Sequence, residues 1–139
     1  YLWRRLPAAA FMGISVAHCD AGQAAVRLPY GWRSQNPFRS IYFAAQCAAG
    51  ELSTGLLGLA ALQGRPPVSM LVLNVEAEFL KKASDTLIFT CSDGEAVNEV
   101  VQKALETAEP QTIRMESTGN LPDGSVAARV WITWSFKKK

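Results

Sequence analysis

The chain has 139 residues, of which 49% are hydrophobic and 19% are charged. This apolar content excludes a disordered chain, and the length suits a single domain that covers residues 1–139. Fourteen Lys and Arg against twelve Asp and Glu give a net charge of +2. No strong basic field is left to hold phosphate backbones, so we expect no nucleic-acid partner.

The cysteines Cys19, Cys47 and Cys91 are widely spaced, and His18 is the only histidine. This set excludes a structural zinc site, and we predict neither a metal nor a cofactor. Sparse thiols are typical of a reducing compartment, so we expect a cytoplasmic protein. The longest apolar stretch, 41–62, is interrupted by polar residues. Each half is too short for a membrane span, which needs about 20 residues.

The first residues predict a hairpin. Arg4 and Arg5 precede an apolar run, as in a signal peptide, but the run leads directly into an alternating pattern. Because the chain also lacks an initiator Met, we interpret this start as a trimmed or incomplete N-terminus. Segments 11–19 and 23–29, rich in Val, Ile and Ala, flank a turn signal at residues 20–22 and predict two paired strands.

Residues 39–63 predict a long helix that follows a turn at Asn36 and Pro37. Glu51 is the only charged residue from 40 to 63, whereas a surface helix has a charged face. At 1.5 Å per residue the helix is a rod of about 35 Å. We expect it to be buried nearly all round, by a curved sheet alone or together with a partner subunit.

The remaining segments alternate between strands and one more helix. Residues 68–79 and 85–92 have the pattern of strands, 95–109 that of an amphipathic surface helix, and 111–119 and 125–139 that of two further strands. We expect hairpins between most neighbouring strands. The predicted fold is therefore α+β, with a mainly antiparallel sheet curved around the central helix.

This arrangement resembles the hotdog fold. A local resemblance runs from Asn36 through Ser40 and Tyr42 to Glu51, and it is to the start of the central helix in the thioesterase-like family DUF4442. That family is related to PaaI-type thioesterases. Residues 127–139, with WITWSFKKK, resemble the last strand of that family. The resemblance implies an acyl-CoA or other acyl thioester as substrate, a homodimer or dimer of dimers, and a site between subunits.

Two departures alter the site that the resemblance implies. In PaaI-type relatives a His-Gly-Gly opens the helix, with an Asp or Glu nine residues after the His. Here Tyr42, Phe43 and Ala44 stand at those three positions, and Glu51 keeps the spacing. The backbone N–H groups that polarise a thioester carbonyl survive this change, while the added side chains restrict the close approach that glycine allows.

Glu51 is the candidate catalytic residue. On a helical period it shares a face with small residues, including Ala44 and Cys47. Burial there would raise the pKa of its carboxyl group and make it a general base for water. The alternative is a structural glutamate that extends its carboxylate to solvent or pairs with a partner. Thr54, one turn away, and its neighbour Ser53 are candidates to hold that water.

The other candidate substrate-binding residues are Asn36, Ser40, Tyr42, Phe43 and Ala44. Asn36 either orients substrate or forms the turn, and Ser40 suits the N-cap of the helix. Tyr42 either donates a hydrogen bond to an acyl carbonyl or packs as an aromatic side chain.

Three hypotheses for the function remain: an acyl-CoA thioesterase, a non-catalytic module that binds acyl chains or acyl-CoA, and a structural dimerisation domain.

Overall fold

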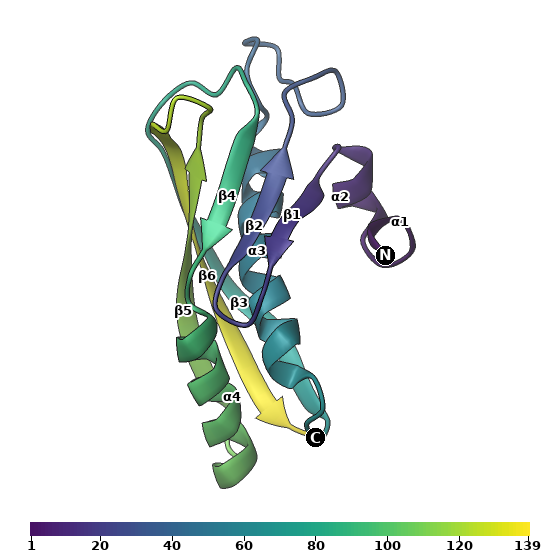
Figure 1. The fold of residues 1–139 in the computed structure, drawn as a ribbon, viewed down its shortest axis with the longest axis vertical. Coiled ribbons are helices and arrows are strands. Elements are labelled where there is room, and N and C mark those ends of the chain that lie inside the picture. The colour runs from purple at the N-terminus through teal and green to yellow at the C-terminus, as the bar shows by residue number, and fades with distance from the viewer.

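The computed structural model describes residues 1–139, and it contains one six-stranded antiparallel sheet with a long helix packed against it (Figure 1). The sheet order is β1-β2-β4-β5-β6-β3. The helix α3 (Phe43–Leu62) contacts β2, β4, β5 and β6, and α4 (Gly94–Thr107) packs beside α3 against β5 and β6. The strands are β1 (Ser15–Cys19), β2 (Ala24–Leu28), β3 (Val68–Phe79), β4 (Leu87–Cys91), β5 (Gln111–Asn120) and β6 (Val126–Lys138). The predicted α+β architecture is confirmed.

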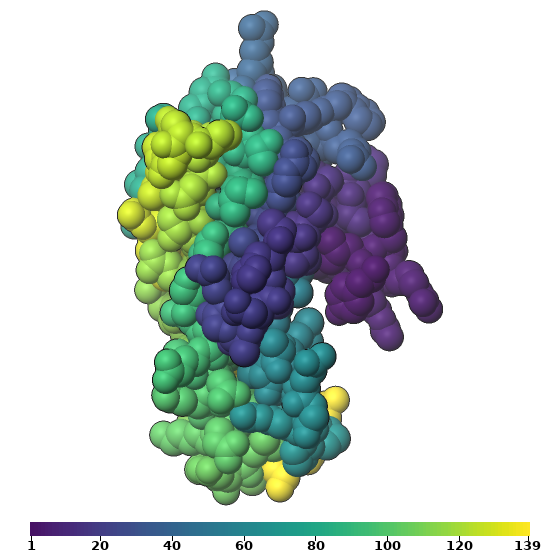
Figure 2. Space-filling model, in the orientation of Figure 1, coloured from purple at the N-terminus to yellow at the C-terminus, as the bar shows by residue number.

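The first fourteen residues differ from the prediction. Two short helices, α1 (Leu2–Arg5) and α2 (Pro7–Phe11), precede β1, where we predicted a strand from Phe11. Pro7 occupies the first position of α2 and is followed by three alanines, and both features favour a helix. The two helices stand out from the body of the molecule (Figure 2).

The strand connections follow the prediction only in part. Hairpins join β1 to β2 and β5 to β6, as predicted. The consecutive strands β3 and β4 do not pair, because β3 lies at the sheet edge beside β6 while β4 lies between β2 and β5. One edge of the sheet is therefore a strand of twelve residues, and the other edge is the five-residue β1.

The inner face of β3 is only half covered. Val75 and Phe79 pair with Ile132 and Ala128, which are fully buried on the helix side of β6. The strand predicted for residues 68–79 is therefore confirmed. Even so, Val75 is 47% exposed and Phe79 is 48% exposed. The helix α3 contacts this edge strand but leaves it only partly covered.

The helix α3 begins at Phe43, four residues later than predicted. Arg39 has a φ of 61°, in the left-handed region, so it cannot belong to an α-helix. The 20 residues of α3 span about 30 Å. None of the helices of the protein is both long enough and apolar enough to cross a membrane.

The expectation that α3 is buried nearly all round is wrong for one side. Eleven of its 20 residues are buried against the sheet. The other nine are exposed or half-buried, and they include Phe43 at the start and Leu56, Leu59, Ala60 and Leu62 near the end. Four half-buried residues form a row that we call the open stripe: Ala44, Cys47, Ala48 and Glu51. These positions are three or four residues apart and therefore lie on one face of the helix.

Gly94 lets the start of α4 pack closely against the tip of the first hairpin. A Cβ at this position would overlap the carbonyl oxygen of Ala21, which belongs to rigid backbone. We expect Gly94→Ala to reduce the free energy of unfolding by about 2–3 kcal/mol, measured by urea denaturation. Gly31, where a Cβ would meet no atom within 4 Å, is the control. Its change to alanine should alter stability by less than about 0.5 kcal/mol.

Candidate active site

The loop that leads into α3 is held together by the side chain of Asn36. Its Oδ1 accepts hydrogen bonds from the N–H of Phe38 at 2.9 Å and from the N–H and hydroxyl of Ser40, both at 3.2 Å. Its Nδ2 donates to the carbonyl of Ile41 at 3.3 Å. Ser40 is therefore part of this loop and not the N-cap of α3 as we predicted. The N-cap is Tyr42, which makes no side-chain capping bond.

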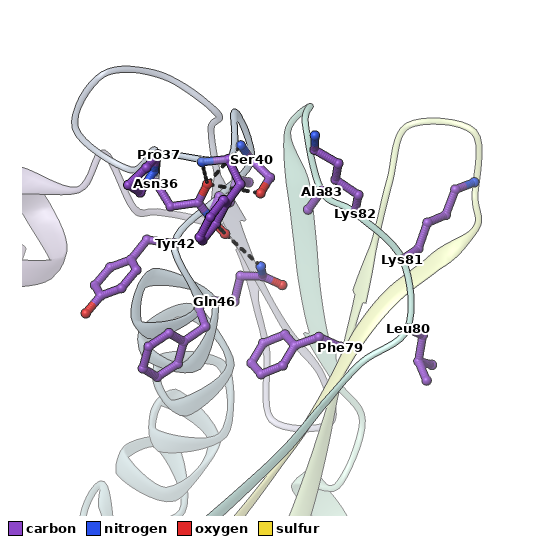
Figure 3. Close-up of a pocket in the computed structure, with 13 residues that line it drawn as sticks. Asn36, Pro37, Ser40, Tyr42, Gln46, Phe79, Leu80, Lys81, Lys82 and Ala83 are labelled. Atoms are coloured by element: carbon purple, nitrogen blue, oxygen red, sulfur yellow. Dashed lines mark hydrogen bonds between the residues drawn. The ribbon is translucent and has the colours of Figure 1, made fainter.

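A pocket of about 700 Å³ opens between this loop, the first turn of α3 and the segment that follows β3 (Figure 3). Four predicted residues line it, namely Asn36, Ser40, Tyr42 and Phe43, together with Gln46 and residues 79–83. The ring of Tyr42 points away from Gln46 (Figure 3).

The apolar wall of the pocket comes from two segments that are far apart in the chain. The ring of Phe43 meets the ring of Phe79 edge to face, with centroids 6.3 Å apart, and both side chains are about half-exposed. Phe43 takes the place of a glycine in the resemblance described above. The substitution therefore adds an aromatic wall to this pocket.

Glu51 lies outside this pocket, on the open stripe of α3. Its carboxylate makes no hydrogen bond or ion pair within the chain. One oxygen, Oε1, lies 3.7 Å from the position that a Cβ on Gly55 would take, beside the ring of Trp134. Burial raises the pKa of the Glu51 carboxyl above its usual value of about 4.5. Glu51 is thus a partly desolvated carboxylate with no partner in the chain.

The N-terminus of α3 offers unpaired donors. The N–H groups of Phe43 and Ala44 have no acceptor in the chain, as expected for the first turn of a helix without a side-chain cap. Ala44 lies on the same open stripe as Glu51. However, the seven-residue separation is about 10 Å along the axis, and the Glu51 side chain turns away toward Gly55. Within one chain, these donors and this carboxylate cannot act on the same carbonyl group.

The hydroxyl groups next to Glu51 are used inside the protein. Thr54 is fully buried, and its Oγ1 donates to the carbonyl of Glu51 and accepts from Trp134 Nε1, both at 2.8 Å. Ser53 Oγ lies 2.7 Å from Ser117 Oγ and 2.8 Å from the carbonyl oxygen of Gly50. A hydroxyl has one proton to donate, so Thr54 has none left for a substrate.

The bond from Trp134 to Thr54 predicts a stability effect. Thr54→Val leaves the buried indole N–H without an acceptor and should reduce the free energy of unfolding by about 1–3 kcal/mol. Thr54→Ser keeps the hydroxyl and should cost clearly less. Chemical denaturation of the two variants beside the wild type measures the difference. Equal stability of the two variants would contradict the importance of this bond.

Other candidate groups are poorly suited to nucleophilic catalysis. Burial raises the pKa of the Cys47 thiol, which keeps it in its less reactive protonated form. His18 lies at the exposed end of β1, with Nε2 2.7 Å from Asp20 Oδ2. No three side chains of His, Cys, Asp or Glu are grouped as metal ligands would be.

Gln46 and residues 80–83 of the pocket lining were not singled out from the sequence. Gln46 interrupts an apolar helix, and that polar residue in a buried segment was the available signal. Residues 79–83 reach the pocket because the end of β3 lies beside the start of α3 (Figure 3). Nothing in the local sequence pattern indicates that contact.

Several solved structures share this fold. A protein of unknown function from Pseudomonas aeruginosa, named a probable thioesterase, has 17% identity and a TM-score of 0.85, with 99% of this chain and 91% of that chain covered. A thioesterase from Haemophilus influenzae has 13% identity and a TM-score of 0.69, with 94% and 82% covered.

A thioesterase from Staphylococcus aureus, solved as a glutamine-to-alanine variant, has 15% identity and a TM-score of 0.67, with 91% and 94% covered. The same protein was also solved as a glutamate-to-alanine variant, with 14% identity, a TM-score of 0.68, and 99% and 98% covered. These likenesses confirm the hotdog fold.

The sequence comparisons identify a family. No curated protein matches this chain. A family model described as "Domain of unknown function (DUF4442)" matches residues 2–135. The chain therefore belongs to the DUF4442 family and has the hotdog fold.

Proposed function

We propose that this protein hydrolyses an acyl thioester such as acyl-CoA, with Glu51 as the general base. The observation that carries the proposal is the Glu51 carboxylate itself, which is partly desolvated, has no partner in the chain and lies on the open stripe of α3. A structural glutamate in such a place would be expected to have a hydrogen-bond or ion-pair partner. The thioesterase names of proteins with the same fold support this reaction class.

The proposed reaction needs two kinds of group. Glu51 takes a proton from water while the oxygen of that water attacks the thioester carbonyl. Backbone N–H groups at the start of α3 stabilise the negative charge that develops on the carbonyl oxygen. The tetrahedral intermediate then collapses, the carbon–sulfur bond breaks, and the proton on Glu51 passes to the leaving sulfur. The products are a free acid and a free thiol.

The two kinds of group come from different chains in this proposal. Because Glu51 and the start of its own helix are too far apart to serve one carbonyl, we place the N–H groups of Phe43 and Ala44 of a second copy opposite Glu51. The half-exposed inner face of β3 and the open stripe support such a homodimer, since a second copy would cover both.

The spacing of two residues gives further support. In the Staphylococcus aureus thioesterase, the glutamine and the glutamate that were changed to alanine are fifteen positions apart. Asn36 and Glu51 have the same separation in this chain. We therefore include Asn36 in the proposed site, where it holds the loop that carries Ser40 and Tyr42.

The direct test is release of free thiol from a panel of short, medium, long and aryl acyl-CoA substrates. Turnover of at least one of them, at a rate well above spontaneous hydrolysis, is the expected result. No turnover with any acyl-CoA or acyl carrier-protein substrate would overturn the proposal.

We also propose a cytoplasmic location, which the three unpaired cysteines support.

A non-catalytic module that binds acyl chains or acyl-CoA is the second candidate. It is favoured by the side chains of Phe43 and Ala44, which restrict the approach of a carbonyl group to the helix N-terminus. In that case acyl-CoA would raise the Tm of the protein and would remain intact after long incubation.

A further inference from the structure

A buried hydrogen-bond acceptor without a donor lies in the wall of the pocket described above. Gln46 is 5% exposed, and its Nε2 donates to the carbonyl of Ile41 at 3.1 Å. Its Oε1 is fully buried and has no hydrogen-bond partner. In Figure 3 this oxygen points into the space between Phe79 and Ala83. Such unpaired buried groups are rare in folded proteins and usually have a reason.

The orientation of the Gln46 amide is fixed by its neighbour. A carbonyl oxygen can only accept a hydrogen bond, so the amide nitrogen of Gln46 must face Ile41. Turning the amide round would place two acceptors against each other. The oxygen is therefore held toward the pocket. Only a group with an O–H or N–H can complete this site.

A lone water molecule fits this position poorly. A buried water needs at least two polar partners. The side chains of Phe79 and Ala83, which border the oxygen, carry no polar atom. The carbonyl of Ala83 accepts the N–H of Ile41 at 2.8 Å, which uses one of its two lone pairs. A donor carried on an apolar ligand suits these surroundings better than water does.

The lining indicates which part of a substrate carries that donor. The walls are largely hydrocarbon and aromatic, with no Asp or Glu among the lining residues. The pocket adjoins the helix N-terminus, where the thioester carbonyl is proposed to bind. We propose that the pocket holds the acyl group of the substrate and that Gln46 selects acyl groups that carry a hydroxyl or amide N–H. This inference rests on the proposed function and adds the substrate class.

Binding of matched pairs of ligands tests the inference without hydrolysis. Each pair consists of a hydroxylated and an unhydroxylated acyl-CoA analogue, of aliphatic or aryl type, in which a methylene group replaces the thioester sulfur. A third analogue carries an amide N–H at the same position, to separate the two kinds of donor. We expect the wild type to bind a donor-bearing member of at least one pair about 10-fold or more tightly by calorimetry.

Two variants locate the preference. Gln46→Met keeps the length of the side chain but has no amide, and it should bind both members of the pair equally. Lys82→Met, at the rim of the same pocket, should keep the preference. If Gln46→Met does not fold, the comparison of ligand pairs on the wild type still decides the matter.

The outcomes separate this inference from the proposed function. Equal binding of all pairs by the wild type overturns the inference. A second result also overturns it: the wild type binds both members of each pair equally, and Gln46→Met binds every ligand more weakly. The group that donates to Gln46 would then belong to the pantetheine arm, which all the ligands share. A donor preference without any thioester hydrolysis supports the pocket assignment and overturns only the proposed reaction.

Discussion

Glu51→Gln is expected to reduce the rate of acyl-thioester hydrolysis by about 1000-fold while leaving the fold intact. The amide has nearly the same size as the carboxyl group but cannot take a proton from water. The loss should appear in kcat, since the acyl group is bound elsewhere in the proposed site. Steady-state thiol release by the two proteins measures it.

The pH dependence gives a second readout for the same residue. The carboxylate form is the active base, so the wild-type rate should rise with pH through the raised pKa of Glu51, above about 4.5, and then level off. Whatever activity Glu51→Gln retains should lack this rise. A wild-type profile that stays flat from pH 4 to 7 would contradict the role of Glu51 as base.

Stability should change in the opposite sense over the same pH range. Because burial raises the pKa of Glu51, the folded state holds the proton more tightly than the unfolded state does. The folded protein is therefore favoured below about pH 4.5 and loses this stability as the pH rises through the raised pKa. Glu51→Gln should match the wild type in Tm near pH 4 and equal or exceed it at pH 7.

A control variant separates this effect from a general loss of acidic charge. Glu99 is exposed on α4 and makes no hydrogen bond or ion pair through its side chain. Glu99→Gln should keep full activity and the wild-type pH profile. If both variants lose activity equally, the effect does not come from the site on α3. Full activity in Glu51→Gln would show that the hydrolysis does not use Glu51 as its base.

The sequence predicted the elements that have a clear period. The amphipathic helix α4, the alternating strand β3 and the apolar helix α3 were all recognised, because hydrophobic spacing reports which face of an element is covered. The boundary of α3 was missed. The left-handed φ of Arg39 and the bonds made by Asn36 set that boundary, and neither follows from hydrophobic spacing.

The site could be predicted only where it lies on one element. Glu51 and the start of α3 are joined by spacing along a single helix, so the sequence places them on one face. The pocket wall formed by Phe43 and Phe79 depends on the sheet order, which puts β3 at the edge beside β6. Gln46 was passed over because its missing partner is visible only once its surroundings are known.

Changing Val75 to lysine on the β3 edge is expected to break the proposed dimer. Val75 is 47% exposed on the helix side of a twelve-residue edge strand whose outer backbone groups have no partner strand in the chain. A charge there would be buried by a second copy, at a high cost in free energy. Sedimentation should show the mass fall from twice 15.1 kDa to 15.1 kDa, with an unchanged circular dichroism spectrum.

The same change should remove activity, although Val75 lies outside the proposed chemistry. A monomer keeps Glu51 but lacks the helix N-terminus of the second copy, and loss of such donors lowers rates by about 100-fold or more. Val16 offers a matched control, because it is 44% exposed on the opposite edge strand, β1. Val16→Lys should leave both mass and activity unchanged. A monomeric Val75→Lys protein with full activity would show that one chain holds the whole site, and the proposed division of the site between two copies would then be wrong.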